Sequence, residues 1–285
     1  MRSVLSRLWS SRAAKAALLF LALVAALGLA APVLPVPDPA AIDAASKLAS
    51  PSASHLLGTD RLGRDLLSRL LFGIRTTVFW SAAALFLTAL IGAAAGAAAG
   101  WLRGKADFLI MRLTDVMMSF PAEVLILAIV GFAGPGIENA VLACVAVKWA
   151  WYARMTRGIV RRLALSGAVK FARTAGASGP RIIASHLFPT AAGELAVLMT
   201  VDAGSVVLLL STLSFLGLGV QPPGAEWGMM LAEAKEVMTL YPWQMIPPGI
   251  AIIAVVSALS LLGDALRDAL DPRHIPGHLQ KGTPS

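Results

Sequence analysis

TTVFWSAAALFLTALIGAAAGAAAGWL, residues 76–102, contains no charged side chain. A helix needs about 20 mostly apolar residues to cross a bilayer, so this stretch is long enough to span one. Gly92, Gly96 and Gly100 recur at every fourth position among alanines. Small residues at this spacing let two helix backbones approach closely in lipid. The stretch therefore predicts a transmembrane helix that packs tightly on a neighbour along its glycine face.

The composition of the whole chain also points to a membrane. Of its 285 residues, 57% are hydrophobic and 14% are charged, whereas a soluble domain carries about 25% charged residues. The net charge of +8 is typical of a membrane protein with basic cytoplasmic loops, so it does not imply nucleic acid. The single cysteine, Cys144, excludes an internal disulfide, and its apolar surroundings predict a small buried side chain.

Five other stretches are apolar enough to predict further spans. They are residues 16–34, about 122–132 extended by the segment before it, 139–152, 195–220 and 243–263. The first follows a basic start, which is also typical of a cleaved signal peptide, but it is long for one and many spans follow. Together the six stretches predict an all-α integral membrane fold with six transmembrane helices and both termini on one side.

The basic residues orient this arrangement. The N-terminus, residues 103–112, residues 153–194 and the tail hold 4, 3, 7 and 3 of the 24 lysines and arginines. The positive-inside rule makes their common side cytoplasmic. Residues 38–75 conflict with the rule, because they hold five basic residues and fall outside, but the other segments outweigh them.

Two polar segments are predicted on the opposite side. Residues 38–75 end in leucines at helical spacing, which predicts an amphipathic helix. Residues 221–242 form a loop with an acidic patch of Glu226, Glu233 and Glu236.

Residues 153–194 are long for a connection between two spans, and such length is uncommon without a purpose. A first helix would carry four arginines, and a second, near 169–175, would stop at Gly176. Ser178 is suited to cap a third helix, with Pro180 in its first turn. The resulting helix–glycine–helix elbow would either lie on the membrane surface or dock on a cytoplasmic partner.

The elbow resembles the EAA loop of ABC importer permeases. Lys170-Phe171-Ala172 stands at the Glu-Ala-Ala place, Gly176 at the glycine, and His186-Leu187-Phe188-Pro189 at the end. The spacing is kept, but the leading Glu and first Ala are not, and only the proline remains at the end. The resemblance implies a set of residues that couple to a partner ATPase: Lys170, Phe171, Ala172, Gly176, Ala177, Ser178, Arg181 and Pro189.

Four further motifs are similar to the C-type permease of dipeptide, oligopeptide and nickel importers. They are HLLGTDRLGRDLLSRLLFGIR (55–75), SFLGLGVQPP (214–223), EWGMML (226–231) and LLGDALRDALDPR (261–273). The resemblance implies a type I ABC importer permease fold. Its permease domain would be residues 76–268, after a span and extracytoplasmic segment (1–75) and before a cytoplasmic tail (269–285).

The same resemblance implies the partners and the location. We expect a bacterial inner-membrane protein that pairs with a second permease subunit as a heterodimer. Two ABC ATPase subunits would bind ATP and Mg, and an extracytoplasmic binding protein would deliver the substrate. Residues 149–155 (WAWYARM) and 38–43 (DPAAID) look more like the nickel importer subunit than the dipeptide one. Nickel, or a nickel chelate, is therefore favoured, with peptides as the alternative.

The chain lacks the motifs of a catalyst. No G-x-x-x-x-G-K-[ST], H-E-x-x-H or G-x-S-x-G pattern occurs, so we expect no enzyme and no cofactor in this chain. The histidines do not cluster at metal spacing, so we expect no stable metal site: His55, His186, His274 and His278.

Charged residues inside spans are candidates for function. Asp202 interrupts the fifth predicted span, where it would line a pathway or pair with a polar partner in the permease dimer. Lys148 is expected to reach the interface beside Trp149, Trp151 and Tyr152. An ion-coupled secondary transporter is another reading, but it would favour paired carboxylates or repeated halves, and no repeat is visible. A non-transporting membrane scaffold is a third.

Overall fold

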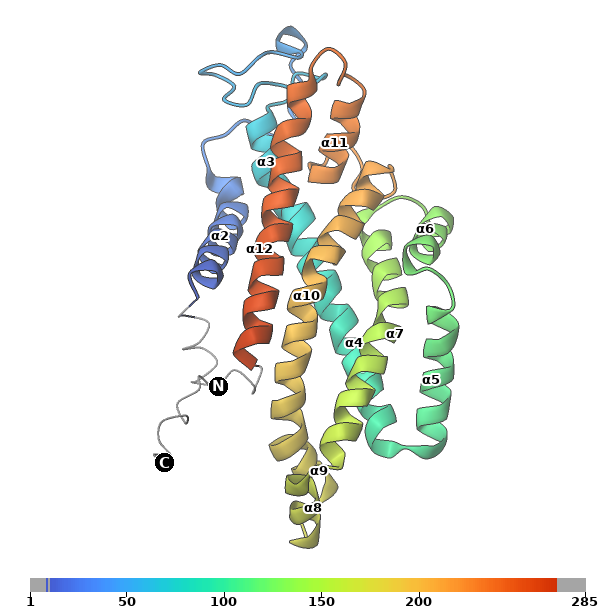
Figure 1. The fold of residues 1–285 in the computed structure, drawn as a ribbon. Helices are drawn as coiled ribbons and strands as arrows, with labels where there is room; N and C mark the ends of the chain where they lie inside the picture. The colour runs from blue at the N-terminus through green and yellow to red at the C-terminus, as the bar shows by residue number, and fades with distance from the viewer. Residues whose placement is uncertain (1–8, 10, 271–285) are drawn as a thin grey trace, which may run out of the picture.

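The computed structural model describes residues 9 and 11–270, and within them every regular element is helical. The long helices run side by side, with α8 and α9 at one end and α11 with the loop before α3 at the other (Figure 1). The α-helices are α2 (Arg12–Ala30), α3 (Leu66–Ile74), α4 (Trp80–Leu102), α5 (Gly104–Met118), α6 (Ala122–Ala133), α7 (Ile137–Ala164), α8 (Gly167–Thr174), α9 (Gly179–Ile182), α10 (Phe188–Phe215), α11 (Trp227–Lys235) and α12 (Ile246–Leu270).

The all-α membrane prediction is confirmed, but the number of six spans is not. Four helical segments are long and apolar enough to cross a membrane: Arg12–Val33, Leu66–Leu102, Gly179–Phe215 and Pro242–Leu270. A fifth candidate is the pair α5 and α6, which are bent by 85° at a short break. The helix α7 is not among these candidates, because it carries Glu138, Lys148 and several arginines.

Several predicted boundaries were wrong because helices continue through them. The amphipathic helix and the second span form one helical segment, joined by a π-helical turn at Arg75–Phe79. The span predicted at 139–152 is part of α7, which runs on through the arginines assigned to a separate loop helix. The last span extends to Leu270, so most of the segment 261–273 is helical, and the tail from 271, with His274 and His278, lies outside the described residues.

The glycine face of α4 packs on α7, as predicted. A Cβ atom added at Gly92 would overlap the backbone of Trp149, and one added at Gly96 would overlap the carbonyl of Ala153. Only glycine lets the two backbones come this close, because any side chain would have to push the helices apart. This contact fixes α7, and therefore everything that α7 carries, against the central span.

Gly96→Ala is expected to destabilise the protein by about 1–3 kcal/mol, since its methyl group would overpack the α4–α7 contact. Gly158→Ala is the matched control, because Gly158 lies in α7 with no atom within 4 Å of an added Cβ. At such an open helix position, alanine is favoured over glycine by about 1 kcal/mol. Thermal unfolding in detergent gives the melting temperatures of the two purified variants. Equal melting temperatures for Gly96→Ala and Gly158→Ala would contradict the packing argument.

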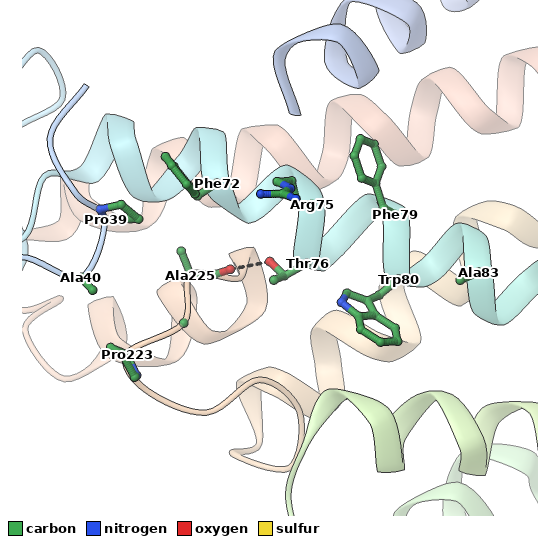
Figure 2. Close-up of a pocket in the computed structure, with 11 residues that line it drawn as sticks. Pro39, Ala40, Phe72, Arg75, Thr76, Phe79, Trp80, Ala83, Pro223 and Ala225 are labelled. Carbon is green, nitrogen blue, oxygen red and sulfur yellow. Dashed lines mark hydrogen bonds between the residues drawn. The ribbon is translucent and has the colours of Figure 1, made fainter. Parts of the chain in front are cut away.

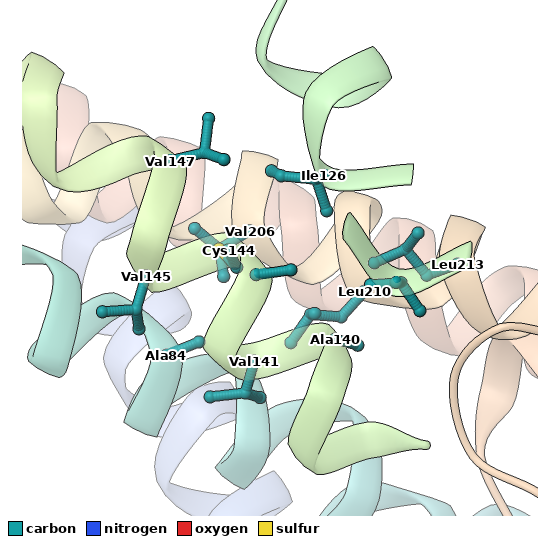
Figure 3. Packing of buried hydrophobic residues seen from close by; sticks show 12 residues of the cluster. Ala84, Ile126, Ala140, Val141, Cys144, Val145, Val147, Val206, Leu210 and Leu213 are labelled. Carbon is teal, nitrogen blue, oxygen red and sulfur yellow. The ribbon is translucent and has the colours of Figure 1, made fainter. Parts of the chain in front are cut away.

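A buried apolar cluster holds α6, the second helix of the bent pair, on the bundle. Ile126 of α6 is fully buried beside α7 and α10 (Figure 3). Val130, one turn further along α6, is fully buried in the same cluster. Cys144 lies inside the same cluster, which confirms that it is a buried apolar side chain. The break between α5 and α6 therefore has a fixed place beside α7.

At the end opposite α8, two segments far apart in the sequence form a polar cap, defined here as residues 55–69 and 226–236. Arg64 and Arg69 both donate to Oε2 of Glu233, at 2.7 and 2.8 Å, and Arg64 also donates to Asp60 at 2.6 Å. All four side chains are nearly buried. Glu226 caps α11 by accepting from the backbone N–H of Met229 at 2.8 Å. Acidic residues of segment 226–236 therefore neutralise the arginines of segment 55–69.

Candidate coupling elbow and membrane-depth groove

The elbow predicted from the sequence is present as α8, a turn and α9. The Ser166 hydroxyl caps α8 by accepting from the N–H of Val169. Gly176 has φ +81°, and the next N–H, of Ala177, donates back to the carbonyl of Ala172 at 3.0 Å. This is a Schellman ending, in which the left-handed position favours glycine. The second helix of the predicted elbow therefore ends just before Gly176, where the sequence placed the stop.

The second arm of the elbow differs from its prediction in two details. Ser178 occupies the cap position of α9 with extended backbone, but its side chain makes no capping hydrogen bond. Pro189 does not end the elbow, because it lies in the first turn of α10. A π-helical turn at Ile183–Leu187 leads directly into α10. Proline lacks the N–H that a regular helix would direct to the carbonyl four residues earlier, which accounts for this irregular turn.

A small core keeps the elbow rigid. Val169, Ala172, Ile182 and Leu187 are buried together, and Trp101 at the end of α4 packs against them with Leu163 and Ala177. The Arg173 guanidinium lies over the Trp101 ring at 5.2 Å. The elbow is therefore packed on the ends of α4 and α7.

Three other predicted residues, Lys170, Phe171 and Arg181, lie on the outside of the elbow. Lys170 and Arg181 are exposed, and the Phe171 side chain is 74% exposed. Ala172 is the member of the Lys170–Ala172 triplet that faces the small core. An exposed aromatic ring on a rigid projection is typical of a contact that a partner covers.

Ion pairs that the sequence analysis missed tie α5 to α7. Asp107 accepts from Arg157, with one distance of 2.8 Å, and also from Arg161. Asp115 pairs with Arg154. The spacing of 107 and 115 on one helix and of 154, 157 and 161 on another, each set on a single face, is the signal that would have predicted this contact. The bent helix is thereby coupled to the same α7 that supports the elbow.

A groove of about 340 Å³ lies at the break between α5 and α6, and we call it the polar groove. It is lined by Met117, Met118, Phe120, Ala122, Glu123, Val147, Lys148, Trp151, Asp202 and Ser205. Asp202 lies near the middle of the 28-residue helix α10, inside a candidate span. The groove is therefore at membrane depth.

Asp202 and Lys148 bind each other in this groove. Lys148 Nζ donates to Asp202 Oδ1 at 2.7 Å and to the Ser205 hydroxyl at 3.0 Å. The buried Tyr152 hydroxyl donates to Asp202 Oδ2 at 3.0 Å. The expectation that Lys148 reaches the interface was wrong, because an opposite charge on α10 is within its reach. The polar partner expected for Asp202 thus lies within the same chain.

A second groove, of about 610 Å³, lies between the segment that follows α3 and the loop after α10 (Figure 2). Its walls are Pro39 and Ala40, the segment from Phe72 to Ala83, and residues 223–225. The Thr76 hydroxyl donates to the carbonyl of Ala225, which fastens the loop after α10 to this segment. Arg75 is the only charged side chain among its lining residues, whereas the polar groove is lined by Glu123, Lys148 and Asp202.

The candidate spans, the bent helix pair and the projecting elbow together describe a polytopic α-helical membrane protein. The model of the family described as "Binding-protein-dependent transport system inner membrane component" matches residues 89–275, and the chain belongs to this family. It is therefore a permease subunit of a binding-protein-dependent ABC importer, a multi-pass protein of the inner membrane and not a catalytic one.

Curated relatives cover nearly the whole chain. The metal-staphylopine import system permease protein of Staphylococcus aureus is 44% identical over 95% of this chain and 93% of its own length. The nickel transport system permease protein of Escherichia coli is 41% identical over 98% of this chain and 99% of its own. The probable D,D-dipeptide transport system permease protein of Escherichia coli is 39% identical over 85% of this chain and 81% of its own length. The resemblance stated from the motifs is thus confirmed.

Proposed function

We propose that this chain forms part of the pathway through which nickel, or a nickel chelate, is imported. Two of the most similar relatives are named for import of nickel or of a metal–staphylopine complex, and they align over almost the full chain. Import of dipeptides or oligopeptides is the second candidate, because a probable D,D-dipeptide permease is 39% identical over a shorter part.

The coupling elbow would receive the driving force from partner ATPases. The single observation that carries this role is the 74% exposed Phe171 on a projection whose own core is buried. Lys170 and Arg181 flank a surface that suits acidic groups of a partner, while Gly176 sets the angle between the two arms. ATP and Mg would bind only to those partners.

The full assembly would contain a second permease subunit, two ATPases and an extracytoplasmic binding protein. Six crossings are obtained when α7 and the bent pair α5–α6 are each counted as one span, so both termini would be cytoplasmic. The elbow and the arginines of the last turns of α7 would then lie on the cytoplasmic side, which agrees with the positive-inside rule. ATP-driven movement of the elbow would tilt α7 and the bent helix together and switch the side on which the pathway opens.

Uptake of radioactive nickel by cells that express the complete importer tests this function. We expect nickel uptake to require both this chain and the ATPases. We also expect an excess of dipeptide not to suppress it. Dipeptide uptake without nickel uptake would favour the second candidate. Nickel uptake by the purified chain alone in liposomes would instead indicate an ion-coupled transporter.

A further inference from the structure

The face of the bundle around the polar groove is unsuited to lipid. Between α5 and α6, Ser119 and Phe120 are exposed and break the helix next to Lys148 and Asp202. Non-helical backbone at membrane depth is tolerated only inside protein or beside a water-filled cavity. Glu123 is also exposed there, and a carboxylate in contact with hydrocarbon is strongly disfavoured. We take this face to border the pathway.

The charged groups of the groove are not equally available to a ligand. Asp202 accepts hydrogen bonds on both oxygens, from Lys148 and Ser205 on one and from Tyr152 on the other. Lys148 uses two of its three N–H groups, on Asp202 and Ser205, and is 16% exposed. Glu123 has no ion pair among the residues that the structure describes. The groove thus offers one free carboxylate and one partly free ammonium group.

This pair of groups is a poor match for a bare divalent cation. Glu123 would be its only free carboxylate ligand, and the Lys148 ammonium would repel it. The other walls are the thioethers of Met117 and Met118 and the rings of Phe120 and Trp151, which are soft and adaptable surfaces. A ligand that carries both a carboxylate and a positive group would instead match the free charges.

We propose that the polar groove contacts the cargo, with Lys148 pairing with a carboxylate of it and Glu123 with its positive group. Specificity at this point would then favour an amino-carboxylate, either bound to a metal or as a peptide, over a bare metal ion. Asp202 acts as a positioning residue that holds Lys148 toward the groove. The inference rests on the proposed function, and it adds the residues that would distinguish one cargo from another.

The test uses the complete importer with its binding protein in proteoliposomes and three probes: nickel alone, nickel with excess histidine, and a labelled dipeptide. We expect Glu123→Gln to lower uptake of the dipeptide and of the nickel–histidine complex about tenfold, a loss that corresponds to one lost charge contact. Glu138→Gln is the matched control, because Glu138 is also exposed in a first helical turn but lies outside the groove. It should transport at the normal rate.

Paired neutralisation separates a cargo contact from a structural ion pair. Lys148→Met alone leaves Asp202 without its cation and can fail through misfolding. Lys148→Met with Asp202→Asn removes both charges, so a purely structural pair predicts restored uptake. We expect uptake to stay about tenfold low, while ATP hydrolysis stimulated by the loaded binding protein is retained.

Each outcome decides between these readings. Normal uptake by the double variant, or by Glu123→Gln, would overturn the proposal. Uptake of nickel alone, with no uptake of the other two probes, would also overturn it. The same holds if the Glu123→Gln chain no longer co-purifies with the second permease subunit, because Glu123 would then bind that subunit. The nickel–histidine and dipeptide arms distinguish a metal complex from a peptide. Wild-type importer that carries no probe would instead contradict the proposed function itself.

Discussion

Gly176→Val is expected to abolish uptake while the chain still inserts and assembles. Gly176 has φ +81°, which valine adopts only with strain because of its branched Cβ. No atom lies within 4 Å of an added Cβ, so the substitution disturbs the turn without a clash elsewhere. The angle between α8 and α9 would change, and with it the proposed contact between Phe171 and the ATPase. Nickel uptake, normalised to the amount of chain in the membrane, measures the effect.

Gly176→Asn is the matched control for this variant. Asparagine tolerates left-handed backbone and can replace glycine at such helix ends. Uptake should therefore be largely retained with asparagine and lost with valine. If valine supported normal uptake, the coupling role of the elbow would be refuted. If asparagine and valine failed equally, the requirement would be for the absence of a side chain and not for the backbone angle.

Glu233→Ala is expected to destabilise the protein by about 3–5 kcal/mol, because it leaves charged groups buried without their partner. Glu233 accepts from both Arg64 and Arg69, whose side chains are 2% and 0% exposed. Asp60 would remain as a counter-charge, bonded to Arg64 but 3.7 Å from Arg69. The melting temperature of the purified protein in detergent should fall strongly, since the polar cap joins α11 to α3.

The control for this variant lies three residues away. Glu236 pairs with Arg61, but these side chains are 57% and 38% exposed, and a pair on the surface contributes about 0–1 kcal/mol. Glu236→Ala should therefore leave the melting temperature nearly unchanged. A similar fall in melting temperature for Glu233→Ala and Glu236→Ala would show that burial of the Glu233 network does not stabilise the cap.

The predictions from sequence were reliable where a local pattern was sufficient. The glycine spacing of α4 predicted its close contact with α7, because a backbone approach depends only on residue size along one face. Gly176 and Pro180 predicted the elbow, since backbone preferences act within a few residues. The predicted end of α7 was wrong, because this helix continues past its hydrophobic stretch, where ion pairs such as Asp107–Arg157 support the polar turns.

The amino-acid sequence by itself determined that the chain spans a membrane, that an elbow with a left-handed glycine projects from it, and, through its motifs, the family. Only the tertiary structure decided which charges meet. Lys148 and Asp202 are 54 positions apart, and Arg64 and Glu233 are 169 apart. Such pairs depend on how helices rotate and cross, which is set by packing over the whole bundle and not by any one segment. The position of the Glu123 carboxylate beside the Lys148–Asp202 pair, with no ion pair to any residue of 11–270, emerges only from that packing.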